Sequence, residues 1–354
     1  MKTTLKKILL TLAVPVILYG CAGAPLPDLY WPEPPDVPRI KYIRDYRGGN
    51  DFKSGSGAAD ILLGAEGGAV LKKPMSVHVS GDGKIFVTDT AASDVFLWDP
   101  EKLTATTLAS MGAKLFYKPI GVATDDNGRI FITDSQTDKV TVLSKTGAIE
   151  ATLQPQVPFK QPTGIAADKV RKKLYVTDTH NHYIVVFDLD TLKYIKTIGK
   201  RGKEEGDFNF PSHIAVGPKG YLYVSDTMNG RIQIFDADGK FVRAFGQFGD
   251  SPGMFARPKG VGVDSEGHIY VVDSAFNNVQ IFDEEGQILM AFASYGSDRG
   301  QMVLPAGIAI DQNDFVYVVD SWNRRVEVFE YLGEKYKARL AAAGTNKDKD
   351  KSKK

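Results

Sequence analysis

The sequence predicts an all-β fold: a six-bladed β-propeller made of four-stranded antiparallel blades. The first observation is a repeat whose units each begin with a proline, spaced 43–49 residues apart: Pro74, Pro119, Pro162, Pro211, Pro258 and Pro305. The second is an aspartate about 15 residues after each proline: Asp89, Asp134, Asp178, Asp226, Asp273 and Asp320. Repeats of 40–50 residues are typical of propellers and solenoids, in which each unit covers the apolar face of the next.

Each unit contains the pattern of four short strands. In the fifth unit, Ile269–Val272 precede the aspartate and Val279–Phe282 follow it. Both runs are rich in β-branched and aromatic residues and are bounded by turn formers, as strands are. We therefore expect strand a after the proline, strand b up to the aspartate, strand c after a loop, and strand d before the next unit.

The sixth unit has no obvious strand d after Gly333, and the missing strand is found near the start of the chain. Residues 39–47 begin Arg-Ile-Lys-Tyr-Ile-Arg-Asp-Tyr, which is similar to the fourth strands at Lys193–Ile198 and Phe241–Phe245. We expect these residues to complete the sixth blade and so close the ring, which leaves no sheet edge open.

The repeat resembles the NHL repeat, in which an aspartate is followed by Asn-x-Arg and an apolar strand. The fourth unit shows the pattern most fully, from Asp226 through Asn229 and Arg231, and the sixth has Asn323 and Arg325. The first two units keep the strands but lack the Asn and Arg. The resemblance covers residues 39–333 and implies a six-bladed propeller.

The two ends of the chain have different compositions from the repeats. Residues 1–20 combine early lysines with an apolar run of about 11 residues, too short to span a bilayer of ~30 Å, and lead to Cys21, the one cysteine of the chain. This resembles a bacterial lipoprotein signal with lipidation at Cys21. Residues 21–38 are proline-rich and are expected to form a tether, and residues 334–354 a disordered, lysine-rich tail. The expected location is the cell envelope, and the outer membrane in a Gram-negative cell.

Charge argues against nucleic acid as a partner. Of the 354 residues a quarter are charged and the formal net charge is +1, but residues 22–333 alone carry about −7. Nucleic-acid binding needs a clustered basic face, which this acidic body does not indicate. The sequence also lacks the phosphate-binding Gly-x-x-x-x-Gly-Lys and the Cys-x-x-Cys-His haem motif.

The six aspartates recur at one place in every unit, which favours a structural role in accepting hydrogen bonds from loop backbone. Positions that vary between units are better candidates for function, and they should lie together around the mouth of the central channel. Several of them are aromatic, Met or Arg, the types enriched in protein interfaces. This candidate binding face consists of Gln136, His180, Phe210, Met228, Arg257, Phe276, Leu304, Trp322 and Arg324.

Histidines offer the alternative of a metal site. His213 stands where other units have glycine, and His180 lies on the loop of the adjacent unit. Peptidyl-hydroxyglycine lyases share the NHL propeller and bind zinc with three histidines at the channel mouth, so His180 and His213 could form part of a zinc or calcium site. Catalytic zinc requires three protein ligands and an open position, and no third histidine matches.

Two functions therefore remain open. The first is a membrane-anchored, non-catalytic, monomeric module that binds a protein or polymer through its loop face and needs no cofactor. The second is a metal-dependent enzyme, similar to the lyases or to gluconolactonases. A shared fold does not decide between them.

Overall fold

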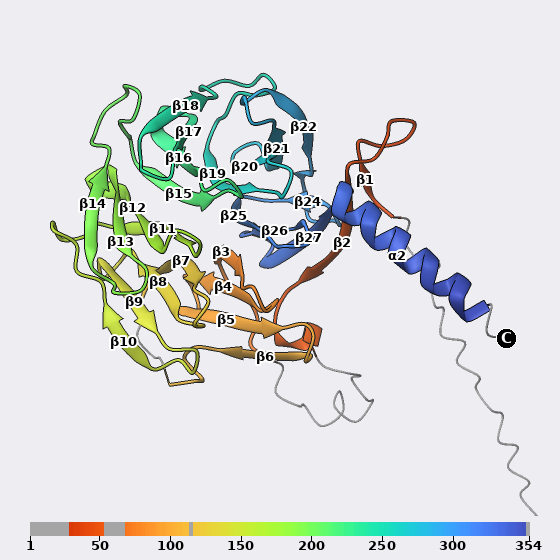
Figure 1. Ribbon diagram of the computed structural model, residues 1–354, viewed down its shortest axis with the longest axis horizontal. Coiled ribbons are helices and arrows are strands. Elements are labelled where there is room, and N and C mark those ends of the chain that lie inside the picture. The colour runs from red at the N-terminus through yellow and green to blue at the C-terminus, as the bar shows by residue number, and fades with distance from the viewer. Residues whose placement is uncertain (1–27, 53–67, 113–115, 352–354) are drawn as a thin grey trace, which may run out of the picture.

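The computed structural model describes residues 28–52, 68–112 and 116–351, so the leader, Cys21 and the first part of the tether lie outside the described residues. Six antiparallel sheets are arranged around a central axis (Figure 1). The six-bladed propeller predicted from the repeat is confirmed. Strand a of every blade lines the axis, and each strand a packs beside the strand a of the next blade around the full ring.

The strands of the first five blades follow the chain in order. Blade 1 contains β3 (Pro74–Val79), β4 (Ile85–Asp89), β5 (Asp94–Asp99) and β6 (Thr104–Thr107). Blade 2 contains β7 (Pro119–Thr124), β8 (Ile130–Asp134), β9 (Lys139–Leu143) and β10 (Ile149–Thr152). Blade 3 contains β11 (Pro162–Asp168), β12 (Lys173–Asp178), β13 (Tyr183–Asp188) and β14 (Tyr194–Ile198). Blade 4 contains β15 (Pro211–Val216), β16 (Leu222–Asp226), β17 (Arg231–Phe235) and β18 (Phe241–Phe245). Blade 5 contains β19 (Pro258–Val263), β20 (Ile269–Asp273), β21 (Asn278–Phe282) and β22 (Ile288–Phe292).

Blade 6 joins the two ends of the chain, as the sequence predicts. Its inner strands are β25 (Pro305–Ile310), β26 (Phe315–Asp320) and β27 (Arg325–Tyr331). Its fourth strand is β2 (Ile40–Tyr46), which pairs antiparallel with β27 from Ile40 opposite Tyr331 to Tyr46 opposite Val326. Figure 1 shows β2 lying along β27. The N-terminal strand therefore closes the ring.

The tether is shorter than expected. A fifth strand, β1 (Tyr30–Trp31), pairs with β2 on the outer edge of blade 6. The Trp31 ring lies 5.7 Å from the Phe329 ring, and Leu29 packs on the same apolar cluster. Residues 28–38 are thus part of the propeller edge, because apolar side chains among the prolines find a partner there.

The segment after Gly333 also differs from the expected disordered tail. Residues Glu334–Lys351 form α-helix α2, which leaves the ring beside β2 (Figure 1). Its first turns are held by side chains of blade 6, through Lys335 to Asp314 and Arg339 to Glu330. Within the three described stretches, no helix is long and apolar enough to cross a membrane.

The hydrophobic core is divided into six clusters, and each lies between two neighbouring blades. No blade buries its faces alone, so each depends on both neighbours for stability. Hydroxyl groups add bonds across these interfaces: Thr88 donates to the carbonyl of Ile120, and Thr133 to that of Thr163. At the corresponding position blades 5 and 6 have Val272 and Val319 instead.

Glycine two residues after the proline lets strands a approach closely near the axis. A Cβ on Gly164 would lie 2.8 Å from Cα of His213, and one on Gly307 would lie 2.7 Å from Cα of Ser76. Blades 1 and 4 carry Ser76 and His213 at this position themselves. These two blades thereby place larger side chains in the channel without losing contact with their neighbours.

Short elements shape the loops at one end of the ring. They are η1 (Gly49–Phe52), η2 (Thr179–Asn181), η3 (Thr227–Asn229) and the parallel pair β23 (Ser294–Tyr295) and β24 (Gln301–Met302). Each proline pairs with the aspartate of its own blade, as Pro74 does with Asp89. The loops between strands b and c therefore lie at the same end of the ring as the prolines, and we call this end the loop face.

Candidate binding face and channel mouth

The repeated aspartates organise the loop face, which confirms their predicted structural role. In blades 1, 2 and 5 each carboxylate accepts backbone N–H groups from both sides. Asp89, for example, accepts from Lys72 and Lys73 before the proline and from Ala91 and Ala92 in the b–c loop. A carboxylate used in this way holds two chain segments together and has no free oxygen for a ligand.

The Asn and Arg of the NHL pattern fix a second loop. In blade 4, Asn229 donates to Asp226 and to the carbonyl of Gly202, and Arg231 donates to Asp226 and to the carbonyl of Asp207. Asn323 and Arg325 make the same contacts in blade 6. These residues therefore anchor the long connection from strand d of one blade to strand a of the next.

Blade 3 has the Asn but not the Arg, and its aspartate is electrostatically different. Asn181 donates to Asp178, whereas Tyr183 stands where blades 4 and 6 have arginine. Burial raises the pKa of Asp178 to about 6. Asp178 thus has no arginine beside it, unlike Asp226 of blade 4 and Asp320 of blade 6.

The residue before each proline takes one of two backbone conformations. Its N–H donates to the aspartate of its own blade at Lys73, Lys118 and Arg257. At Gln161, Phe210 and Leu304 the N–H instead donates to a side chain of the preceding blade, and φ is about +50°. The backbone that presents these candidate residues is therefore fixed by hydrogen bonds, although their side chains vary between blades.

Exposed apolar side chains lie at two places on this face. Met228 is 54% exposed and exchanges hydrogen bonds with Asn209, next to Phe210. Trp322 is 68% exposed and Leu304 is 44% exposed, and they are neighbours because the N–H of Trp322 donates to the carbonyl of Val303. Phe276 is half-buried, with its N–H bound to Asp273.

Other predicted residues meet in a groove between blades 2 and 3. Gln136 and His180 line a hollow of about 310 Å³ together with Lys118, Lys160 and Gln161. His180 also contacts Phe210 edge-to-face at 5.2 Å, and His182 does so at 4.5 Å. Phe210 is consequently half-buried, less accessible than its loop position indicated.

The histidines do not assemble a metal site. His213 lines the central channel, where its Nδ1 lies 3.0 Å from Oγ of Ser212, while His180 turns to Phe210 in the loop. Among the described residues no three His, Cys, Asp or Glu side chains are placed to hold a metal ion. The ligand set that zinc or calcium would need is therefore not provided by His180 and His213.

The channel itself is lined mainly by small aliphatic residues, but polar atoms make up more than half of its exposed surface. It has a volume of about 210 Å³ and is lined by Val, Ala, Ile and Gly side chains, with His78 on blade 1 and His213 on blade 4. Burial lowers the pKa of both histidines to about 3, so both are neutral at neutral pH. Nε2 of His213 is buried without a hydrogen-bond partner.

Cations surround the mouth of this channel, and Lys259 is the residue that the sequence reasoning missed. It follows Pro258, at a position where the other blades have Met75, Ile120, Thr163, Ser212 and Ala306. Burial, with the charges of Arg257 and Lys73, lowers the pKa of Lys259. The signal available in the sequence was a single charge at a position that is otherwise uncharged.

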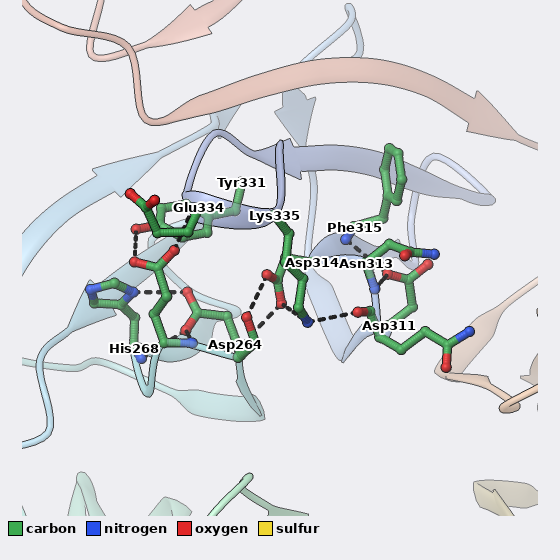
Figure 2. A network of polar contacts seen from close by, with 12 residues as sticks. Asp264, His268, Asp311, Asn313, Asp314, Phe315, Tyr331, Glu334 and Lys335 are labelled. Atoms are coloured by element: carbon green, nitrogen blue, oxygen red, sulfur yellow. Dashed lines mark hydrogen bonds and ion pairs between the residues drawn. The ribbon is translucent and has the colours of Figure 1, made fainter. Parts of the chain in front are cut away.

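The opposite end of the ring holds a polar network at the base of α2, shown in Figure 2. Asp264 accepts from the backbone N–H groups of Glu266 and His268, from the Tyr270 hydroxyl, and lies 2.9 Å from Nδ1 of His268. Lys335 and Ser265 both reach Asp314. Ser265 links the blade 5 loop to Asp314 of blade 6, and Lys335 of α2 binds the same carboxylate, so the helix docks on the ring at this network.

Comparison with known proteins places the chain in a family. The SMP-30/gluconolactonase/LRE-like region matches residues 64–242, just over half of the chain. A six-bladed β-propeller family of undefined function matches residues 211–277, and the NHL repeat matches residues 303–329. Human NHL repeat-containing protein 2 is 36% identical over 92 residues, which are 23% of this chain and 12% of that protein.

Solved structures share the fold at low identity. A virginiamycin B lyase from Staphylococcus aureus is 16% identical with a TM-score of 0.54, covering 84% of this chain and 90% of that one. An auxiliary nutrient binding protein from Bacteroides thetaiotaomicron is 16% identical with a TM-score of 0.59, covering 74% and 69% of the two chains. With its matched region, its six blades and its NHL unit, this chain belongs to the SMP-30/gluconolactonase/LRE-like family of β-propellers.

Proposed function

We propose that this protein is a binding module, held at a bacterial membrane by a lipid on Cys21, that recognises a protein partner through the loop face. The observation that carries the proposal is the exposed pair Trp322 and Leu304, presented on a backbone that hydrogen bonds fix in place. A large exposed aromatic residue on a rigid loop loses little conformational entropy on binding and is typical of an interface centre.

The chemistry of the face supports binding over catalysis. Its carboxylates are occupied by backbone amides, and the described residues bring no metal-ligand cluster to the channel mouth. Proteins with this fold include both lyases and nutrient-binding proteins, so the fold agrees with either activity. The residues of this chain favour the binding role.

The proposed location rests on the leader. Its charged start, short apolar run and Cys21 are the features of a lipidated export signal. Ala22 rather than Asp follows the cysteine, which favours the outer membrane in a Gram-negative cell. Residues between Cys21 and β1 then separate the bilayer from blade 6.

The test is capture of partners from membrane extract by the wild type and by Trp322→Ala. We expect capture to fall about 30-fold in affinity, equivalent to about 2 kcal/mol, with little change in melting temperature. Leu289→Ala, which removes a 52% exposed side chain on β22 away from the loop face, is the matched control. Equal capture by Trp322→Ala and the control contradicts the proposal, as does stoichiometric zinc or calcium in protein purified without chelator.

A further inference from the structure

We propose that the mouth of the central channel binds a carboxylate group from an acidic segment of the protein partner, at Lys259, Arg257 and Lys73. The inference rests on the proposed function and names the chemistry of the partner at the centre of the face. Two blades contribute these cations, since Lys73 precedes β3 of blade 1 while Arg257 and Lys259 flank Pro258 at the start of β19 in blade 5.

Lys73, Arg257 and Lys259 lack internal counterions among the described residues. Within the part of the chain that the structure describes, no ion pair involves the side chains of Lys73, Arg257 or Lys259. The nearest carboxylates in sequence register, Asp89 and Asp273, are fully buried and accept hydrogen bonds from the backbone N–H groups of Lys73 and Arg257. These aspartates therefore bind the backbone of Lys73 and Arg257 and do not neutralise the charges of the two side chains.

Positive charge is unfavourable at the position of Lys259. Lys259 is half-buried, and its pKa is lowered by burial and by its proximity to Arg257 and Lys73. Repulsion and desolvation both disfavour such a cluster in the free protein. Residues 22–333 carry a net charge of about −7, so the local positive charge opposes the overall composition. A bound anion removes this cost.

Neutral polar groups of blade 4 lie near Lys259. His213 feels the charge of Lys259, its Nε2 has no hydrogen-bond partner, and its Nδ1 lies beside Oγ of Ser212. A carboxylate oxygen at the mouth would find an N–H donor in the Nε2 tautomer of His213 and a cation in Lys259. The channel of about 210 Å³ has room for several waters at roughly 30 Å³ each, which matches one side chain better than a polymer.

Apolar neighbours point to a peptide as the source of the carboxylate. Blade 5, which carries Arg257 and Lys259, stands between blade 4 with the exposed Met228 and blade 6 with the exposed Leu304 and Trp322. A segment with glutamate or aspartate flanked by apolar side chains would match both features. A free phosphate would match the charges alone.

The five histidines of the chain provide the readout by proton NMR. Hexaglutamate is titrated into the full propeller at constant ionic strength, with hexaglutamine and inorganic phosphate as separate arms. We expect saturable shifts of the His213 resonance, which is assigned by its loss in His213→Gln. His268, in the network at the opposite end of the ring, is expected not to move. Hexaglutamine should leave both unchanged.

Substitutions then locate the site. Lys259→Gln and Arg257→Gln should each weaken hexaglutamate binding at least 10-fold, whereas Lys145→Gln, which removes one cation from the turn between β9 and β10, should not. Shifts of His268 equal to those of His213, an absence of saturation, or unchanged binding by Lys259→Gln overturns the site. Phosphate binding as tight as hexaglutamate overturns the acidic segment as its ligand. Loss of hexaglutamate binding in Lys259→Gln, together with partner capture that Trp322→Ala leaves unaffected, would refute the proposed function and keep the carboxylate site.

Discussion

The backbone N–H of Phe210 donates to Nδ1 of His182 at 3.2 Å, across the boundary between blades 3 and 4. The same relationship joins Asp138 to Gln161 and Asn277 to Leu304. In each pair the acceptor residue has a positive φ, as the corresponding Ser93, Gly230 and Arg324 also do. In the blades that follow Ser93, Gly230 and Arg324, the residue before the proline is Lys118, Arg257 or Lys73. Its N–H donates to the aspartate of its own blade instead.

This pattern predicts that the side-chain acceptor on the preceding blade determines the backbone conformation of the residue before the proline. The positive φ of the loop residue does not determine it. Asn277→Gly relieves the positive φ but leaves the N–H of Leu304 without its acceptor. An unpaired donor costs about 1–2 kcal/mol, so we expect the melting temperature to fall by a few degrees.

Ser93→Gly is the control, because Ser93 has the same φ and accepts nothing from Lys118, and the variant loses only the exposed hydrogen bond from Oγ of Ser93 to the carbonyl of Tyr117. Thermal unfolding of this variant should match that of the wild type or exceed it slightly. Similar melting temperatures for the two variants would show that the acceptor has no influence.

Ring closure predicts a graded response to N-terminal truncation. Removal of residues 22–27 should leave stability unchanged, and removal of residues 22–38 should cost the contacts of Trp31 with Phe329 and Phe292. Removal of residues 22–48 also deletes β2, which exposes the edge of β27 and the apolar side of blade 6. Calorimetry should therefore give three distinct melting temperatures in that order, and equal values for the last two would refute closure by β2.

Lipid anchoring is tested by Cys21→Ala. The leader offers one cysteine as acceptor, and loss of the acyl chains should move the protein to the soluble fraction after a salt wash. The measurement is fractionation of cells that express the wild type and the variant, with mass spectrometry of the mature N-terminus. A variant that stays in the membrane fraction would show that another feature holds it there.

The repeat was predictable from the sequence because Pro, Asp and the apolar strand residues recur at fixed spacing. The ring closure followed because residues 39–47 carry the pattern of a fourth strand. Helix α2 and β1 were missed since their partners, such as Asp314 for Lys335 and Phe329 for Trp31, are distant in sequence. The composition of the two segments, rich in Pro or Lys, indicated only that they differ from the blades.

The candidate site was predictable only in part. The variable loop positions identified Trp322, Met228 and Leu304, which are exposed, and Phe210, which two histidines cover. Neither the positive φ of Leu304 nor the cluster of Lys259 with Lys73 could be seen, because both depend on contacts between blades.

Glu327 on β27 provides a prediction about pH. The equivalent residues of blades 4 and 5 are Gln233 and Gln280. Their Oε1 atoms accept the N–H of Gly206 and Gly253, and their Nε2 atoms donate to the carbonyls of Asp207 and Met254. Oε1 of Glu327 accepts the N–H of Gly300, but its Oε2 is buried without a partner. A protonated Glu327 would restore the donor that the glutamines supply.

Burial raises the pKa of Glu327 from 4.5 to about 8, with Arg325 opposing the shift. The protonated form is therefore favoured in the folded protein. Protonated Glu327 stabilises the fold fully below pH 4.5. This stabilisation is lost as the pH rises through 8, because the same carboxyl group has a lower pKa in the unfolded chain and releases its proton first there. Glu327→Gln removes this pH-dependent loss. The unfolding free energy of the variant should therefore exceed that of the wild type only slightly at pH 4.5 and by about 1–3 kcal/mol at pH 8.

The reverse substitution in blade 5 is the control. Gln280→Glu places a carboxyl group in the equivalent fully enclosed position without an arginine beside it, since Asn278 stands where blade 6 has Arg325. We expect it to destabilise the propeller increasingly above pH 5, by more than the wild-type Glu327 does, because no cation stabilises the charged form. Urea unfolding of the wild type and both variants at pH 4.5, 6 and 8 measures the effect. A pH-independent difference between Glu327→Gln and the wild type would mean that Glu327 is ionised in the fold and that Arg325 compensates for its burial.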